Sequence, residues 1–204
     1  MRRIIIMAAM AVLCMQTADA QNWQDLLRRL TGGSSKQAST EQTAEEQTPA
    51  LTAATLCTTW TYSAPAMKYE GNDMLASIAL KGVESYLPAL YAKVGLTSGT
   101  GKATFTTLHD VHAEAGDHKA SGSYTFDPST GDIVITAGRG DATASFHGTA
   151  TLEDGTLVLL FDAAEAADIM EKMSESAAKN EQFKTMKSLL DSYPGIKLGC
   201  KMTR

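Results

Sequence analysis

The chain of 204 residues lacks every common catalytic motif. It contains no GxSxG, no HExxH, no CxxC and no glycine-rich loop of the kind that binds phosphates. The sequence therefore predicts a protein that is not an enzyme and that needs no cofactor. A hydrolase or isomerase that uses carboxylates at the mouth of a barrel stays open as an alternative, although no pattern selects such a pair.

The chain also has no run of Lys or Arg residues. Its 18 basic and 23 acidic residues give a net charge of -5 with neutral histidines. A surface that binds nucleic acid needs a basic patch, so this balance argues against DNA or RNA as a partner.

One long apolar run occurs, and it lies at the start of the chain. Residues 4–15 follow two arginines and precede the small-x-small cleavage site ADA at 18–20. This pattern predicts a signal peptide over residues 1–20 and an exported protein, either periplasmic, at the cell surface or secreted. Cys14 leaves a lipid anchor open as an alternative to simple removal of the signal. No later stretch is long and apolar enough for a transmembrane helix.

Cysteine is scarce as well. The chain has three cysteines, and only Cys57 and Cys200 lie outside the predicted signal peptide. In an oxidising compartment these two could form a disulfide that ties the ends of the folded region together, or they could be two separately buried thiols. Both interpretations stay open on the sequence alone.

The segment over residues 21–50 follows the predicted signal peptide. It combines a short amphipathic piece, QNWQDLLRRL, with a stretch rich in Ser, Thr, Gln and Glu. That stretch cannot bury enough apolar surface to offset its ordering entropy, so we expect a disordered linker. The folded domain is predicted over residues 51–204, which is long enough to form one core.

Alternation of apolar and polar residues recurs along this domain and predicts strands. Two helical patterns interrupt it, one over residues 72–94, where Pro88 implies a kink or a break, and one over 163–193, divided near Asn180. Short turns between the strands favour hairpins and antiparallel neighbours, and eight such strands can close into a barrel. The predicted strands lie at 58–63, 102–108, 111–115, 118–126, 132–138, 142–152, 156–161 and 195–203.

Four stretches of the sequence resemble a known family. TTWTYSAPAMKYEGNDMLA, GSYTFDPSTGDIVI, LLFDA and SLLDSYPGIKLGCKM are similar to a lipocalin-like domain of unknown function that occurs in small secreted proteins of gut-type Bacteroidetes. The similarity covers residues 51–204. It implies a mainly β fold, a lipocalin-like eight-stranded antiparallel barrel with helices between strands 1 and 2 and between strands 7 and 8. It implies no catalytic residues, because none are established for the family.

Three of the four histidines lie within the stretch TLHDVHAEAGDHKASG at 107–122. A tight turn at Gly116 would pair its two halves as a hairpin and send His112 to the outer face. His118 would stay with the inward set near a rim, and His147 would point to solvent. A zinc site needs three or four convergent ligands, so no metal site is predicted.

Many inward positions of the predicted barrel carry small side chains, which leaves space inside it. We expect either a partly open apolar cavity, with the helix over 72–94 across its mouth, or a core plugged by side chains and a helix. The sequence therefore predicts a non-catalytic protein that binds a small apolar ligand. The alternative is an envelope or surface interaction protein with a filled barrel and a protein partner. The expected cavity lining consists of Trp60, Tyr62, Tyr124, Phe126 and Phe146.

Overall fold

The computed structural model describes residues 51–71, 84, 87–93, 95–116, 118–139, 142–173, 179 and 181–204. The predicted signal peptide, the predicted linker and most of the helix predicted over 72–94 lie outside the described residues. Within the described part of the chain, no helix has the length and apolarity that crossing a membrane requires.

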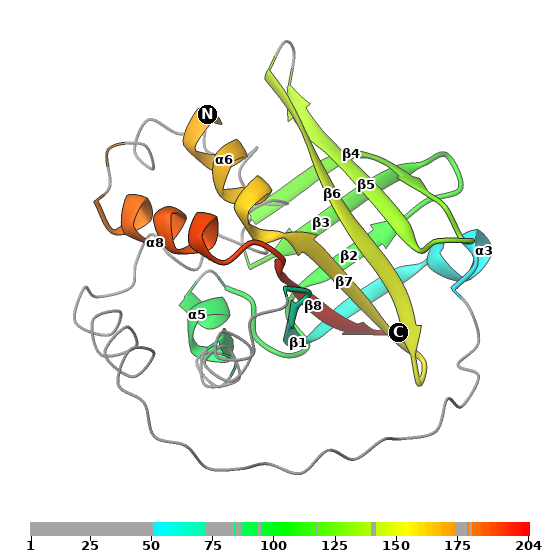
Figure 1. The fold of residues 1–204 in the computed structure, drawn as a ribbon. Coiled ribbons are helices and arrows are strands. Elements are labelled where there is room, and N and C mark those ends of the chain that lie inside the picture. Colours follow the sequence, from blue (N-terminus) through cyan, green and yellow to red (C-terminus); the bar gives the residue numbers. More distant parts are fainter. Residues whose placement is uncertain are drawn as a thin grey trace.

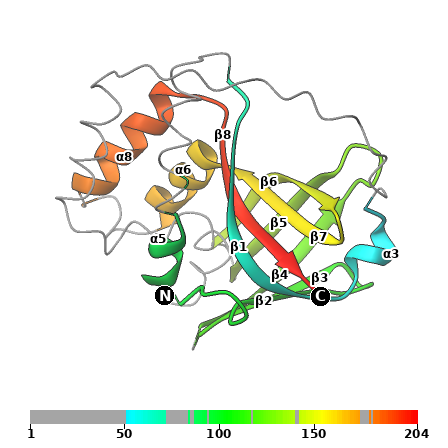
Figure 2. The ribbon, with the colours of Figure 1, turned by 90° about the horizontal axis from the view of Figure 1, so that it is seen from below.

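Eight antiparallel strands close into a barrel, in which each strand pairs with its neighbours along the chain and β8 returns to β1 (Figures 1 and 2). The predicted fold is confirmed, since all eight predicted strands are present. The strands are β1 (Thr59–Tyr69), β2 (Lys102–Phe105), β3 (Asp110–Ala115), β4 (His118–Phe126), β5 (Asp132–Arg139), β6 (Ala142–Glu153), β7 (Thr156–Asp162) and β8 (Ile196–Thr203).

The first strand is longer than the sequence predicts. The alternation of apolar and polar residues indicates a strand over 58–63, but β1 continues to Tyr69 because its second half pairs with β8. A bulge between Tyr62 and Ala64 inserts one extra residue and reverses the alternation. The period of two is therefore broken in the middle of a continuous strand.

Short helices cover the two ends of the barrel. In both ribbon views α3 (Ala53–Leu56) lies at one end, and α5 (Leu87–Lys93), α6 (Ala163–Met173) and α8 (Glu181–Ser192) gather at the other (Figures 1 and 2). We call these ends the α3 end and the helix end. The helical pattern predicted over 163–193 corresponds to α6 and α8, and Asn180 lies outside the described residues.

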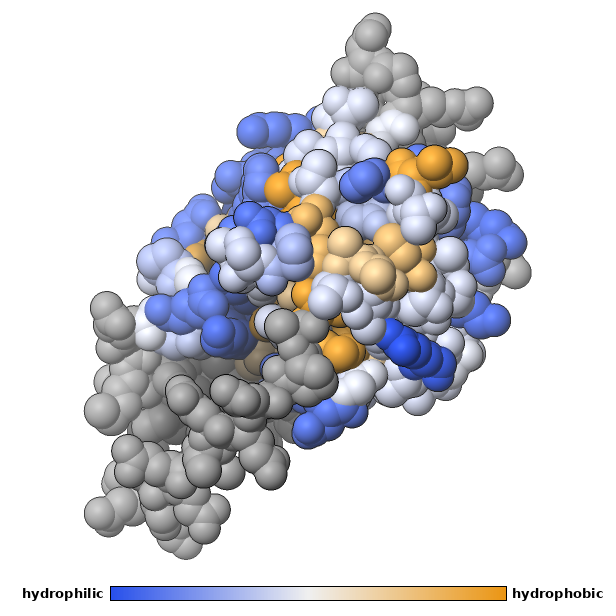
Figure 3. Space-filling view, turned by 90° about the vertical axis from the view of Figure 1, so that its right-hand side faces the viewer, coloured by the Kyte–Doolittle hydropathy of each residue, from blue (hydrophilic) through white to orange (hydrophobic). Residues whose placement is uncertain are grey.

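Contacts between distant parts of the sequence close the α3 end. The Trp60 Nε1–H donates a hydrogen bond of 3.0 Å to the carbonyl oxygen of Leu56, which ties α3 to β1. The guanidinium of Arg204 lies 5.0 Å from the centre of the Trp60 ring and donates to the Thr55 carbonyl oxygen at 3.2 Å. Seen from this side, polar residues surround a narrow apolar stripe (Figure 3). The two termini of the barrel domain thus seal its α3 end together.

Candidate ligand site in the barrel

The five aromatic residues predicted to line a cavity do not belong to one surface. Trp60, Tyr62 and Tyr124 are members of the buried cluster next to α3, and Phe126 packs against that cluster. Phe146 belongs to a second cluster, which lies at the helix end. Trp60, Tyr62 and Tyr124 therefore belong to the packed core, and Phe126 packs against it. Phe146 lies in the cluster at the helix end.

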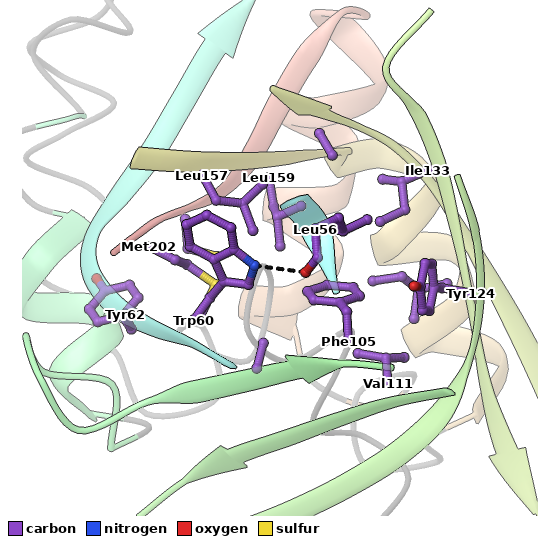
Figure 4. Close-up of a cluster of buried hydrophobic side chains, with 14 of the residues drawn as sticks. Leu56, Trp60, Tyr62, Phe105, Val111, Tyr124, Ile133, Leu157, Leu159 and Met202 are labelled. Carbon is purple, nitrogen blue, oxygen red and sulfur yellow. Dashed lines mark hydrogen bonds between the residues drawn. The ribbon is translucent and has the colours of Figure 1, made fainter. Parts of the chain in front are cut away.

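Large side chains fill the half of the interior next to α3, which we call the α3-end core (Figure 4). Phe105 and Tyr124 meet edge to face with ring centres 5.1 Å apart, and this arrangement suits the charge distribution of aromatic rings. Five of the side chains have no exposed surface at all, so no water-sized space adjoins them. These fully enclosed residues are Leu56, Trp60, Ile133, Leu157 and Met202.

Small side chains line the other half of the interior along β3 to β6. Strand pairing shows that they share the inward face, because Val111 of the α3-end core pairs with Gly122, Gly122 with Ala137 and Ala137 with Ala144. They lie toward the helix end, where β3 and β5 finish and β4 and β6 begin. We call this set the alanine wall: Ala113, Ala120, Gly122, Ala137 and Ala144.

The helix-end cluster combines side chains of the strands with those of α5, α6 and α8. Leu87 and Leu190 come from helices, and Ile196 and Leu198 come from the start of β8. Met67 and Tyr69 at the end of β1 are only partly buried against this cluster. The helix end therefore has an apolar cover that is less completely enclosed than the α3-end core.

Tyr62 and Tyr91 connect α5 to the barrel. Their rings stack with centres 5.9 Å apart, and the Tyr91 hydroxyl donates a hydrogen bond of 2.7 Å to the Gly199 carbonyl oxygen of β8. Tyr91 is almost completely buried. Its hydroxyl thus finds a partner inside an otherwise apolar environment, which fixes α5 beside β1 and β8.

The inward face has almost no electrostatic character. Among the inward strand positions whose side chains are described, none carries Asp, Glu, Lys or Arg. The buried polar groups are hydroxyls and thiols, for example the Tyr124 hydroxyl, which donates to the Thr106 carbonyl oxygen at 2.9 Å. Burial, with a smaller contribution from the neighbouring Cys57 thiol, raises the pKa of Tyr124 above its usual value. The described part of the inward face is therefore mainly apolar.

Both cysteines outside the predicted signal peptide are free thiols. Cys57 Sγ lies 3.2 Å from the Tyr124 hydroxyl, whereas Cys200 pairs with Pro65 in the middle of β8. The sequence-based idea that barrel closure brings the two together is corrected by this register. Cys57 lies two residues before β1, and the strand from Thr59 to Pro65 spans roughly 20 Å, whereas a disulfide requires Cα atoms within about 7 Å.

The histidines lie at separate places on the barrel. The pairing of Ala115 with His118 and of His112 with Ser121 confirms the predicted hairpin, and His112 is exposed. His118 is exposed at the rim. Within the described residues, no group of three or more His, Cys, Asp or Glu side chains could hold a metal ion.

His147 lies outside the barrel but has a partner that the sequence does not indicate. Its Nδ1 is 2.6 Å from Oε1 of Glu165, and the other oxygen of Glu165 accepts from the His147 backbone N–H at 3.3 Å. The Asp162 carboxylate accepts from the Glu165 backbone N–H and caps the start of α6. The spacing of Asp162 and Glu165 predicts a helix start, but only the fold reveals that Glu165 also binds β6.

A family model described as "Lipocalin-like domain (DUF4923)" matches residues 32–204, which is most of the chain. The chain belongs to this family. The match begins inside the segment that the sequence predicts as a linker. The closed eight-stranded antiparallel barrel fits the description of the family as lipocalin-like. No curated protein and no solved structure matches this lipocalin-like domain.

Proposed function

We propose that this lipocalin-like domain binds a small apolar ligand at the helix end of its barrel and catalyses no reaction. The observation that carries the proposal is the alanine wall, which replaces bulky core residues along β3 to β6. Ala113 and Ala137 are almost completely covered by other parts of the protein, so a guest would reach them where the helix-end cover gives way and would then be shielded from water. Small inward residues in an eight-stranded barrel leave room for one small molecule.

The ligand class follows from the chemistry of the wall. Methyl groups and glycine offer apolar contact without charge, and the opposite strands contribute Met67, Phe161 and Leu198. Of the predicted lining residues, Phe146 belongs to this helix-end cluster. A guest with an uncharged, apolar body would therefore bind between the alanine wall and the helix-end cluster.

The first experiment is native mass spectrometry of protein purified without detergent, before and after extraction with organic solvent. A discrete extra mass that solvent removes would support the proposal and identify the class of the ligand. For the emptied protein, titration with the uncharged fluorophore N-phenyl-1-naphthylamine gives an affinity. An unchanged mass together with no saturable fluorescence would overturn the proposal.

Two matched variants locate the binding site. Ala137→Leu adds bulk to the alanine wall and should weaken binding of the fluorophore by about tenfold, because a leucine fills the space of several ligand atoms. Thr125→Leu makes a similar apolar addition on the exposed outer face of β4 and should leave the affinity unchanged. Equal effects of the two variants would place the binding site elsewhere.

We propose further that the ligand is bound outside the cytoplasm, in the periplasm or beyond it. The support is the predicted signal peptide over residues 1–20. Amino-terminal sequencing of the protein from cell fractions tests this. A mature chain that begins at Gln21 in the periplasmic or extracellular fraction is the expected result, and an uncleaved cytoplasmic chain contradicts it.

A further inference from the structure

The hairpin of β5 and β6 extends beyond the strands on either side of it. β4 pairs with β5 only as far as Ala137, and β7 pairs with β6 only from Gly148 onward. Between these points the two strands pair only with each other, and Figure 1 shows this hairpin rising beyond the rest of the barrel. We call residues 138–139 and 142–147 the β5–β6 arm.

A glycine marks each point at which the arm leaves the barrel. A side chain at Gly122 would collide with the Thr136 carbonyl oxygen, and one at Gly148 would collide with the Leu160 carbonyl oxygen. Glycine thus permits an unusually close approach of the strands at the last pair on each side. Gly122 and Gly148 therefore lie at the last residue pairs before the arm separates from β4 and β7.

The outer edge of the arm has unused backbone groups. The His147 N–H bonds to Glu165 and so points away from β5, and in an antiparallel ladder every second residue points the same way. The N–H and C=O groups of Thr143 and Ser145 therefore also point away from β5. Among the described residues, none of these four groups has a hydrogen-bond partner. This edge can accept another strand.

Glu165 occupies this edge at His147, but within the described residues the part from Thr143 to Ser145 has no such protection against strand addition. Free edges are commonly shielded by lysine, proline, inward-pointing charges or bulges. The stretch from Ala142 to Thr149 contains no Lys, Arg, Asp, Glu or Pro, and its pairing with β5 is regular. Thr143 is exposed and Ser145 is half-buried, so the edge is open to a partner.

We propose that the β5–β6 arm is a dimerisation edge, on which β6 of a second copy pairs antiparallel with β6 of the first. The two-fold axis passes beside Ala144, so that Thr143 of each copy lies opposite Ser145 of the other. These two pairs exchange four backbone hydrogen bonds, which use all four free groups of each copy. The contact between His147 and Glu165 stays intact in this register.

The side chains of the edge are complementary to themselves. Ala144 next to its own copy places two of the smallest side chains at the axis, where paired strands come closest. The outer face already has cross-strand hydroxyl pairs, Thr136 with Ser145 at 2.8 Å and Thr59 with Thr104 at 2.9 Å. Pairing Ser145 with Thr143 of the second copy extends this arrangement without charge repulsion. A second copy therefore fits this edge better than a strand of unrelated sequence would.

Sedimentation velocity of the purified protein over a wide range of concentration tests the proposal. The expected result is a reversible monomer–dimer equilibrium. Thr143→Lys should weaken dimerisation by at least about tenfold, because an edge lysine opposes strand addition. The matched control is Thr151→Lys on the same face of β6, where Val158 of β7 already occupies the neighbouring position. This control should change the dimer constant by less than about twofold.

Two further variants test the backbone contact and the register. Ser145→Pro removes one outward N–H and no hydrogen bond to β5, so it should abolish the dimer of a protein that stays folded by circular dichroism. Mixing Thr143→Lys with Ser145→Glu should restore a heterodimer through one Lys–Glu pair. A chain that stays monomeric up to about 1 mM overturns the proposal. Equal weakening by Thr143→Lys and Thr151→Lys, or an unaffected Ser145→Pro dimer, also overturns it.

Discussion

The two ends of the barrel interior are built from side chains of very different size. The α3 end has Trp60, Phe105 and Leu157 in contact with no room for water, whereas the alanine wall contributes only methyl groups and one glycine from four strands. The backbone is the same closed barrel at both ends. This difference suggests separate roles: the α3-end core stabilises the fold, and the alanine wall is the candidate site for a ligand.

The helices that cover the two ends of the barrel are also held by different kinds of contact. At the α3 end a single turn of helix is held by the buried indole of Trp60 and by Arg204. At the helix end, an exposed hydrogen bond between His147 and Glu165 holds α6, whereas the buried Tyr91 hydroxyl holds α5. Contacts in water are weaker than buried ones, so the exposed contact between α6 and β6 contributes less than the buried hydrogen bond of Trp60.

The largest expected effect is at Trp60. Trp60→Ala removes a fully buried ring and its hydrogen bond to Leu56, and should lower the free energy of unfolding by about 3–5 kcal/mol. Urea denaturation measures the change. Phe146→Ala at the helix end provides the comparison and should cost less, because that side chain is not fully enclosed. Equal losses would mean that the two ends are packed alike.

The second prediction compares two buried alanines on the inward face. Ala150→Leu adds bulk to the α3-end core and should destabilise by about 1–3 kcal/mol, because overpacking forces neighbours to move. Ala137→Leu adds the same atoms to the alanine wall and should cost less than about 1 kcal/mol if space is available there. Thermal unfolding of the ligand-free variants measures both. A larger cost at Ala137 would show that the wall is as tightly packed as the core.

The third prediction uses Cys200 as a reporter of burial. Burial raises the pKa of its thiol to about 12 from the usual 9.0. Above pH 9 the native protein keeps a thiol proton that the unfolded chain loses. The burial of Cys200 therefore contributes fully to the free energy of unfolding below pH 9, and this contribution falls as the pH rises toward 12. At pH 10 the loss is on the order of 1 kcal/mol. Urea unfolding between pH 8 and pH 10 should show a shallower decline for Cys200→Ala than for the natural chain, and parallel declines would contradict the prediction.

The smallest expected effect concerns the hydrogen bond between Glu165 of α6 and His147 of β6. Glu165→Gln weakens the contact with His147, which is largely exposed, so the cost in stability should be below about 1 kcal/mol. Hydrogen exchange is the sharper measurement. We expect faster exchange in α6 and at the His147 amide, with no change in the α3-end core. Faster exchange throughout the barrel would mean that this contact supports the whole fold.

Much of the fold was predictable because hairpin-linked strands obey local rules. The turn at Gly116 and the alternation on either side of it predict the register of β3 and β4, residue by residue. The second half of β1 was not predictable in the same way, because the bulge after Tyr62 breaks the alternation. Only pairing with β8, far away in the sequence, shows that the strand continues.

The sequence predicts which residues face the barrel interior, but not which end of the barrel each of them occupies. The sequence indicates both small and aromatic inward residues, yet it cannot tell which of them meet inside a closed barrel. The register separates Trp60 and Tyr124 in the filled end from Phe146 at the helix end. It also assigns Tyr91 and Glu165 roles that no local pattern reveals, since each bonds to a strand distant in the sequence.

The sequence by itself determined most of the strands and their antiparallel order, because both depend on alternation and turns within a few residues. The tertiary structure decided which side chains share an end of the barrel, why Cys57 and Cys200 stay apart and which edge of β6 is left unpaired. Closing the sheet fixes the offset between β1 and β8 and the points at which β4 and β7 leave the β5–β6 hairpin. Those offsets depend on contacts between residues far apart in the chain, and local sequence rules do not encode them.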